Sequence, residues 1–301
     1  MLFSRVFNHG RTRGSRNGAP VTVPSRATLT SSTHQLNFSG GSVLVPRPVR
    51  LGRSLTDAGP RPSITATATC LIRATEQHRQ ANARLVDDPY ARLFLAEPLR
   101  TLAGSRYRPL RSMTLADPLT LGTPSFVLLR HRFIDDLLCM AQRQAADLPH
   151  SPLHRVEIDF ERASLADTLL DAGFAPDTAT FVVWEGVTPY LTADAVRDTL
   201  GALSKVLGPG PGSVIAAEFA ERPVGALDPT RVGMLIGESV LAAIGESVRF
   251  LLPRDELPAL VAGLGYEVHE LANGRELSHR YRAVRRTIAN PFQYVAALAL
   301  R

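Results

Sequence analysis

The stretch FVVWEGVTPYL, residues 181–191, places a carboxylate directly after a run of apolar residues. The run from Phe181 to Trp184 is typical of a short strand that helices cover on both faces in an α/β protein. Ligands bind such sheets in the crevice outside the carboxyl ends of the strands. Glu185 follows the predicted strand and precedes Gly186. The pattern leaves two interpretations open: Glu185 contacts a ligand at this edge, or it is a solvated residue at the end of a strand.

Strands and helices alternate on both sides of this stretch, which predicts an α/β fold with a largely parallel sheet. The spacing of apolar residues predicts a long helix over 125–148, preceded by helices over 64–85 and from residue 90. Strands are predicted over 154–160, 178–185, 212–220, 266–272 and 292–300. The closing strand at the C-terminus suits a sheet with an antiparallel edge.

Composition divides the 301 residues near position 60. Residues 1–60 hold eight arginines and one acid, a net charge of +7, and we expect them to form a disordered N-terminal extension. Their composition fits an organelle transit peptide or an upstream start codon in a bacterial protein, and we favour the second. Residues 61–301 form the predicted folded domain and carry a net charge of −1, which argues against a nucleic-acid partner.

Several other classes of protein are disfavoured. No apolar run approaches 18 residues, so no membrane span is expected, and a signal-peptide core is not seen in the first 60 residues. A cytoplasmic location is therefore expected. Cys70 and Cys139 lack the spacing of metal ligands or of a disulfide framework, so we expect no structural metal.

Several ordered blocks stand out along the chain, and they are SITATATCLIRATEQHRQANARLVDDPYARLFL, LLRHRFIDDLL, HRVEIDFERASLADTLLDAGF, FVVWEGVTPYLT and IGESVRFLLPRDELPALVAGLGYEVHEL. Together they resemble the S-adenosylmethionine-dependent methyltransferases related to leucine carboxyl methyltransferase, especially their actinobacterial branch. The resemblance runs from about residue 63 to the C-terminus. It implies a class I, Rossmann-like sheet with an antiparallel last strand and extra N-terminal helices over the active site. It also implies S-adenosylmethionine as the cofactor.

The resemblance assigns roles to four residues. It implies that Arg130 reaches the methionine carboxylate of the cofactor, which a guanidinium can hold in a bidentate manner. It implies that Asp159 and Phe160 flank the adenine. Glu185 corresponds to the glutamate of the family's Glu-Gly block, beside the cofactor at the exit of the fourth strand, and this favours the ligand interpretation of Glu185.

Three further residues have weaker assignments, and no general base is assigned. Tyr190 could line the acceptor pocket, and Arg280 and Tyr281 align loosely with a C-terminal block of relatives. The acceptor implied by the family is an oxygen nucleophile, a carboxylate or hydroxyl of a small molecule or peptide. An ionised carboxylate needs no general base, so the protein would chiefly align donor and acceptor. The oligomeric state is left open.

The chain departs from the family after LLRHRFIDDLL. Relatives continue with a strand, a glycine-rich loop, a helix and a second strand ending in a ribose-binding acid, and none of this lies between Asp136 and His154. We therefore expect a sheet without its first two strands and weak cofactor binding or none. Three accounts stay open: a methyltransferase shortened by deletion or by a truncated gene model, a catalytically inactive binding protein, or a different α/β protein such as a hydrolase.

Overall fold

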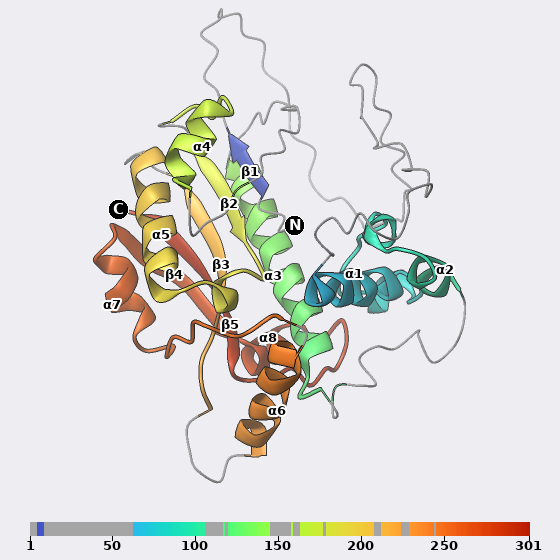
Figure 1. Ribbon diagram of the computed structural model, residues 1–301. Helices are drawn as coiled ribbons and strands as arrows, with labels where there is room; N and C mark the ends of the chain where they lie inside the picture. Colours follow the sequence, from blue (N-terminus) through green and yellow to red (C-terminus); the bar gives the residue numbers. More distant parts are fainter. Residues whose placement is uncertain are drawn as a thin grey trace, which may run out of the picture. The chain divides into compact units, whose positions relative to one another are not determined.

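The computed structural model describes residues 5–8, 63–105, 117, 120–144, 158, 163–176, 179–207, 212–223, 229–243 and 245–301. The helices are α1 (Ile64–Glu76), α2 (Leu99–Gly104), α3 (Thr123–Gln144), α4 (Leu165–Asp171), α5 (Ala193–Leu207), α6 (Pro229–Ala243), α7 (Leu257–Ala262) and α8 (Gly274–Arg280), with 3-10 turns η1 (Ala81–Ala83), η2 (Ala91–Phe94) and η4 (Thr188–Tyr190). The strands are β1 (Arg5–Asn8), β2 (Thr180–Trp184), β3 (Val214–Ala220), β4 (Tyr266–Asn273) and β5 (Gln293–Leu300) (Figure 1).

The sheet has the order β1-β2-β3-β5-β4. β2 and β3 are parallel, and β5 runs antiparallel to both of its neighbours, β3 and β4. The predicted α/β class and the antiparallel last strand are confirmed, and the arrangement of β2, β3, β5 and β4 is that of a class I methyltransferase sheet. The edge strand β4 pairs antiparallel with β5, so the predicted antiparallel edge is confirmed, and β5 itself lies inside the sheet.

The other edge of the sheet is occupied by β1, which pairs antiparallel with β2 so that Arg5 stands opposite Val183 and Asn8 opposite Thr180. β1 comes from the segment that we expected to be disordered, and the rest of residues 1–60 lies outside the described residues. The predicted strand over 154–160 also lies outside them, except Ile158, which belongs to no strand. β1 therefore covers the edge of β2 that faces away from β3.

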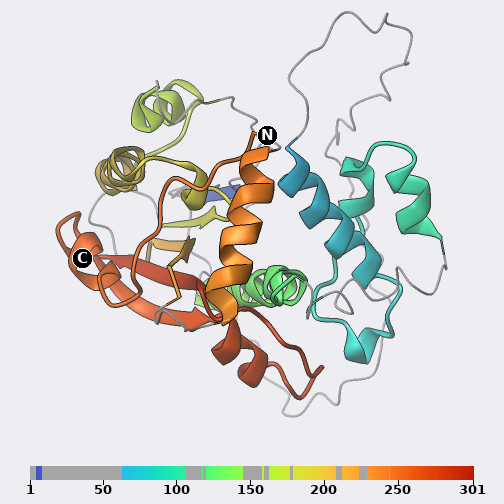
Figure 2. The same cartoon turned by 60° about the horizontal axis from the view of Figure 1, so that its bottom comes forward.

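Side chains on the two faces of the sheet enter two separate hydrophobic cores. Val182 and Trp184 of β2 point into the core formed with α5 and α7, whereas Phe181 and Val183 point into the core formed with α3 and α8. This follows from the alternation of side chains along a strand. Figure 2 shows α3 and α5 on opposite sides of the strands. Helices thus cover both faces, as the apolar run FVVW predicts.

The N-terminal helices differ in length from the prediction. α1 starts as predicted at the cap residue Ser63, whose hydroxyl accepts the N–H of Ala66, but it ends at Glu76 rather than at Leu85. Glu76 turns its carboxylate back onto the N–H of Leu85 at 2.8 Å, and this contact fixes the chain after the helix. In place of the helix predicted from residue 90 the structure has η2, and the Asp88 carboxylate accepts the N–H of Ala91, its first residue, at 3.0 Å.

A residue far along the chain also caps α1. Glu246, which follows α6, accepts the backbone N–H of Ile64 at 2.8 Å and that of Thr65 at 3.4 Å. A carboxylate at a helix N-terminus satisfies N–H groups that have no partner within the helix. The first turn of α1 is therefore tied to the segment after α6. No helix among the described residues is long and apolar enough to cross a membrane.

Candidate active site at the carboxyl end of β2

Arg130 lies in the middle of α3, on the face that packs against the sheet. Asp117 fixes the start of this helix, since its carboxylate accepts the N–H of Ser125 at 3.0 Å. One turn before Arg130, the ring of Phe126 lies 5.8 Å from the guanidinium carbon. Arg130 is 4% exposed, so its charge is removed from water and requires partners within the protein.

Two glutamates provide these partners, one directly after β2 and the other near the end of β3. Trp184 pairs with Ala217 in the parallel register of β2 and β3, so the next residues along, Glu185 and Glu218, stand at the same level. Both side chains continue the alternation that faces α3, the side occupied by Val183 of β2 and Ala216 of β3. The fold therefore brings two carboxylates beneath one arginine.

The three side chains form a compact buried cluster, which we call the Arg130 cluster. One carboxylate oxygen of Glu185, Oε1, accepts from Arg130 Nε at 2.9 Å and lies 2.7 Å from Nη2. Arg130 Nη1 donates to Oε2 of Glu218. The Glu218 side chain is 2% exposed and that of Glu185 is 12% exposed, so Glu185 lies on the more accessible side of the cluster.

Gly186 turns the chain immediately after Glu185. Its φ of +71° lies in the left-handed region that favours glycine. An added Cβ would meet no atom within 4 Å, so glycine is required here for backbone conformation and not for space. The turn directs the Gly186 N–H to Oε2 of Glu218 at 2.8 Å. The Glu-Gly pair in the opening sequence thus places one carboxylate and one amide in the same cluster.

Burial and mutual charge shift the three ionisation equilibria in different directions. Burial would raise the pKa of Glu185, but the charge of Arg130 and the hydrogen bond from His131 hold that pKa well below its usual range. Burial raises the pKa of Glu218, and the neighbouring charge of Glu185 adds to this rise against the effect of Arg130. Arg130 keeps its proton, because the two carboxylates raise its pKa despite its burial. Two acids with opposite shifts are a feature of many active sites.

The Arg130 cluster and its neighbours include residues that had no role assigned from the sequence. Glu218 is the most important of them, and a charged residue within the apolar strand VIAAEFA was a signal that could have revealed it. His131 lies with Nδ1 3.4 Å from Oε2 of Glu185. Arg73 of α1 pairs with Asp88, and its charge also lowers the pKa of Glu185.

Tyr190 lies half-buried at the end of η4, close behind Glu185 in the chain. Burial raises the pKa of its hydroxyl, and a hydrogen bond with Thr65 opposes this rise. The negative charge of Glu218 raises the same pKa further, whereas the positive charge of Arg130 lowers it. Its place beside the Arg130 cluster is compatible with the predicted lining of an acceptor pocket, which stays a prediction.

Arg280 and Tyr281 contact α3 beyond Arg130 and do not reach the cluster in any described contact. The guanidinium of Arg280 lies 5.1 Å from the ring centroid of Phe133 and pairs with Glu270. The hydroxyl of Tyr281 donates to Asp136 at 2.8 Å. These contacts account for both residues as supports of α3.

Asp159 and Phe160, the predicted adenine contacts, lie outside the described residues. Of the four predicted cofactor residues, the structure therefore brings together Arg130 and Glu185. Among the residues that are described, no group of three or more His, Cys, Asp or Glu side chains could hold a metal ion.

Comparison with known proteins finds a similar family. The model of the family described as "Leucine carboxyl methyltransferase" matches residues 66–147 and 142–204, a span that includes both Arg130 and Glu185. The match covers a little under half of the 301 residues and is a similarity to this family. Curated protein sequences contain no match to this chain. Among solved structures, the chain is similar to "Structure of the Mitomycin 7-O-methyltransferase MmcR", with 15% identity over 74% of this chain and 76% of the other and a TM-score of 0.29.

In the arrangement that the chain adopts, the Arg130 guanidinium has no free edge for the carboxylate of a cofactor. A carboxylate binds a guanidinium best along one edge, through two N–H groups. The edge formed by Nε and Nη2 is already held by Glu185, and Nη1 is held by Glu218. A ligand carboxylate would have to displace Glu185 from that edge.

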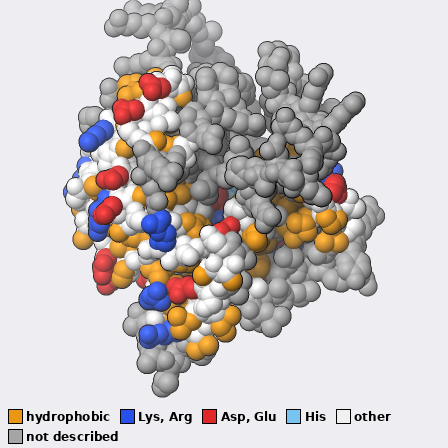
Figure 3. Space-filling view, viewed as in Figure 1, with side chains coloured by type: hydrophobic (Ala, Val, Ile, Leu, Met, Phe, Trp, Pro, Cys, Tyr) orange, Lys and Arg blue, Asp and Glu red, His pale blue; other side chains and the backbone are white. Residues whose placement is uncertain are grey.

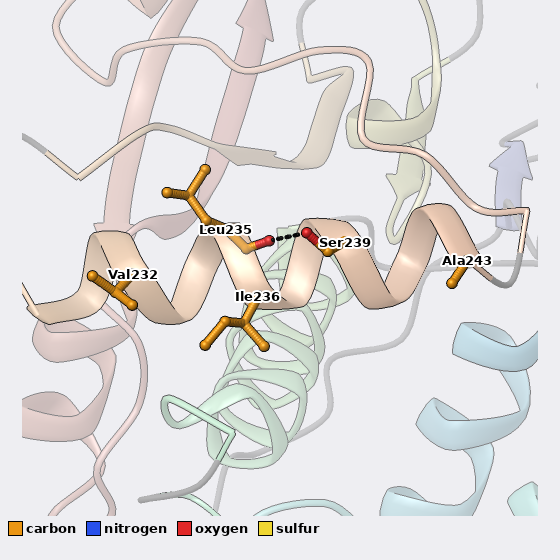
Figure 4. A pocket seen from close by; sticks show the side chains of 5 residues that line it. All are labelled: Val232, Leu235, Ile236, Ser239 and Ala243. Carbon is orange, nitrogen blue, oxygen red and sulfur yellow. Dashed lines mark hydrogen bonds between the residues drawn. The ribbon is translucent and has the colours of Figure 1, made fainter.

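A separate apolar hollow of about 410 Å³ lies on α6 and is lined by Val232, Leu235, Ile236, Ser239 and Ala243. Figure 3 shows hydrophobic side chains gathered over α6 at the bottom of the view, and Figure 4 shows Ser239 bonded to the backbone of Leu235 on its own helix. The hollow contains none of the predicted site residues.

Proposed function

We propose that this protein is an S-adenosylmethionine-dependent methyltransferase that transfers the methyl group to an oxygen nucleophile. The acceptor is a carboxylate or hydroxyl of a small molecule or peptide. The observation that carries the proposal is the buried contact between Arg130 and Glu185, because these residues lie where the family resemblance puts two cofactor contacts. They meet at the carboxyl end of a parallel strand, the edge at which α/β sheets bind ligands.

We also propose that the cofactor binds weakly. Hydrogen bonds to charged groups contribute about 1.5–3 kcal/mol each. A ligand carboxylate that replaces Glu185 on Arg130 forms hydrogen bonds like those that it breaks. The net gain in binding free energy is therefore small. The glycine-rich loop and the ribose-binding acid of relatives have no counterpart between Asp136 and His154, which removes further contacts. From near-micromolar binding, about −8 kcal/mol, a loss of about 4–6 kcal/mol leaves a dissociation constant of about 1 mM or weaker.

One observation favours a second candidate, a catalytically inactive methyltransferase-like binding protein. Arg130 is neutralised by two carboxylates of its own chain, Glu185 and Glu218, which is a self-contained arrangement of charges. A binding protein of this kind would retain the fold and its buried cluster without turnover. The other alternative is a truncated gene model, in which the segment missing between Asp136 and His154 is absent from this sequence but present in the protein.

Calorimetric titration with S-adenosylmethionine tests the proposal. We expect heat consistent with a dissociation constant of about 1 mM or weaker. In the variant R130K this binding should disappear, because a lysine lacks the planar fork. The matched control R132K lies two residues along the same helix, where Arg132 pairs with Asp136 at 3.0 Å, and should bind as the wild type does. Low-micromolar affinity would refute weak binding.

A transfer assay separates the two candidates. Wild-type protein is incubated with methyl-labelled cofactor and mixtures of small carboxylates, hydroxyl compounds and peptides. Label in a base-labile product indicates a methyl ester and a carboxylate acceptor, whereas base-stable label indicates a hydroxyl acceptor. Cofactor binding without transfer to any mixture supports the binding protein. If no binding is detected at several times the expected dissociation constant, the methyltransferase proposal fails.

A further inference from the structure

We propose that Glu218 is a positioning residue, which orients the guanidinium of Arg130 and the backbone turn at Gly186 for ligand binding. The inference rests on the proposed function, because it concerns the same site. It goes beyond the family assignment of roles, in which Glu218 had none.

The contacts of Glu218 join three elements. Its Oε2 atom accepts from Arg130 Nη1 of α3 and from the Gly186 N–H after β2, the latter at 2.8 Å. Its Oε1 atom accepts from Gln293 Nε2 at the start of β5, at 3.2 Å. Gln293 is itself held by Asn290, whose Nδ2 donates to Gln293 Oε1 at 2.6 Å. One carboxylate that is 2% exposed thus connects α3 with the ends of two strands.

The orientation of Arg130 follows from which nitrogen Glu218 binds. A guanidinium is planar, so a partner fixed on Nη1 determines where the opposite edge, Nε and Nη2, must point. That edge points to Glu185, whose side chain is 12% exposed and is the more accessible of the two carboxylates. Glu218 therefore orients the edge of Arg130 that Glu185 holds and that a ligand carboxylate would have to take over, on the accessible side of the cluster.

Charge balance argues that Glu218 does more than neutralise Arg130. Glu185 alone matches the single charge of Arg130, with contacts of 2.7 and 2.9 Å. A second buried carboxylate adds repulsion and a desolvation cost, so it is a poor device for stability alone. The second carboxylate, Glu218, connects Arg130 with the Gly186 N–H. This connection fixes the position of the arginine side chain relative to the turn.

Three variants of the full-length protein distinguish the effect of the position of the Glu218 carboxylate from the effect of its charge. E218A removes this connection, and E218D keeps the charge but is one methylene too short to reach both Arg130 and Gly186. E218Q keeps the length and an oxygen for the Gly186 N–H. The control E76Q alters a glutamate that is 3% exposed and pairs with Arg285 at 2.8 Å, with no described contact to the Arg130 cluster.

The first measurement needs no ligand. Nitrogen-15 NMR follows hydrogen exchange at the Nε–H of Arg130, assigned by its loss in R130K, and at the Gly186 N–H. We expect exchange at both positions to quicken by about tenfold or more in E218A and E218D. E218Q should preserve the protection of Gly186 better than the other two variants, and E76Q should change neither position. Unchanged exchange of Arg130 in E218A and E218D would overturn the proposal.

The second measurement is a chemical-shift titration with S-adenosylmethionine. The dissociation constant should rise about tenfold or more in E218A and E218D, less in E218Q, and not in E76Q. An equal rise in E76Q would show a general effect of lost stability and would overturn the positioning role. If the wild type itself does not bind the cofactor, the proposed function fails, and the exchange experiment still decides whether Glu218 positions Arg130. If E218A does not fold, E218D and E218Q carry the comparison.

Discussion

Glu185, directly after β2, and Glu218, near the end of β3, stand at the same level and bind the same guanidinium, that of Arg130. The register of β2 and β3 creates this arrangement, because it puts two acids side by side on the face that α3 covers. Two negative charges and one positive charge share a space from which water is largely removed. The cluster therefore makes stability depend on pH in a way that differs for each acid.

For Glu218 the free energy of unfolding should fall as pH rises. Its pKa is raised in the folded protein, so between the ordinary value of about 4.3 and the raised value the folded state binds more protons than the unfolded state. E218Q removes this titration. The stability of E218Q relative to wild type should therefore increase with pH in that interval, by up to about 1.4 kcal/mol per pH unit. Urea unfolding from pH 4 to pH 8 measures the slope, and parallel curves for the two proteins would contradict the expectation.

For Glu185 the dependence has the opposite sign. Its pKa is lowered in the folded protein, so the stability that it contributes is present above about 4.3 and is lost as pH falls below that value. E185Q should be less stable than wild type at pH 7 by about 3 kcal/mol, since it breaks a buried ion pair. The difference should shrink in acid unfolding between pH 4.5 and pH 2.5. A difference that stays constant over that range would exclude a lowered pKa.

The left-handed turn after Glu185 should tolerate glycine alone. Gly186→Ala places a Cβ on a backbone with φ +71° and should cost about 1–2 kcal/mol of stability. Gly201→Ala is the matched control, because Gly201 lies inside α5 and its added Cβ would meet only Leu264, at 4.0 Å. Alanine there should stabilise the protein by about 0.5–1 kcal/mol. Chemical denaturation of both variants gives the comparison, and equal costs would show that conformation is not the cause.

The pairing of β1 with β2 should matter for solubility. Prolines at Val6 and Phe7 together remove two backbone donors from β1 and prevent regular pairing with β2. An uncovered edge of β2 favours pairing between molecules, so the double variant should self-associate as its concentration rises. Light scattering across a range of concentrations tests this. A monodisperse double variant with unchanged unfolding would show that β1 does not protect the edge.

The encoding DNA provides a test of the shortened segment. We predict that translation in all frames around the codons for residues 140–146 contains the strand, glycine-rich loop and helix of relatives. That result would support a truncated gene model. Continuous codons without such a sequence would favour a true deletion.

The features of the sheet that depend on local pattern could be predicted from the sequence. The apolar run at 181–184 and the alternation of strands and helices predicted β2, its burial on both faces and the α/β class, because hydrophobic periodicity directly reflects burial. The position of β5 inside the sheet could not be predicted in this way, since strand order depends on contacts between distant segments. β1 was missed because composition alone suggested disorder for residues that pair with a distant strand.

The site could be predicted only in part, because some of its contacts join segments that are distant in the sequence. Arg130 and Glu185 were found through ordered blocks of family resemblance, and the structure joins them at 2.9 Å. Glu218 was missed, because its role depends on the parallel register of β2 with β3 and on the turn at Gly186, neither of which a linear pattern specifies. An acid within an apolar strand was the available signal.

The cap that Glu246 places on α1 has a consequence for the order of folding. The N–H groups of Ile64 and Thr65 find this carboxylate about 180 positions away in the chain, so closing the contact carries a large loss of chain entropy. Such contacts tend to form after local ones, and we expect the first turn of α1 to gain protection only once α6 and the segment after it are in place. The helix that begins the folded domain would then be completed among the last of its parts.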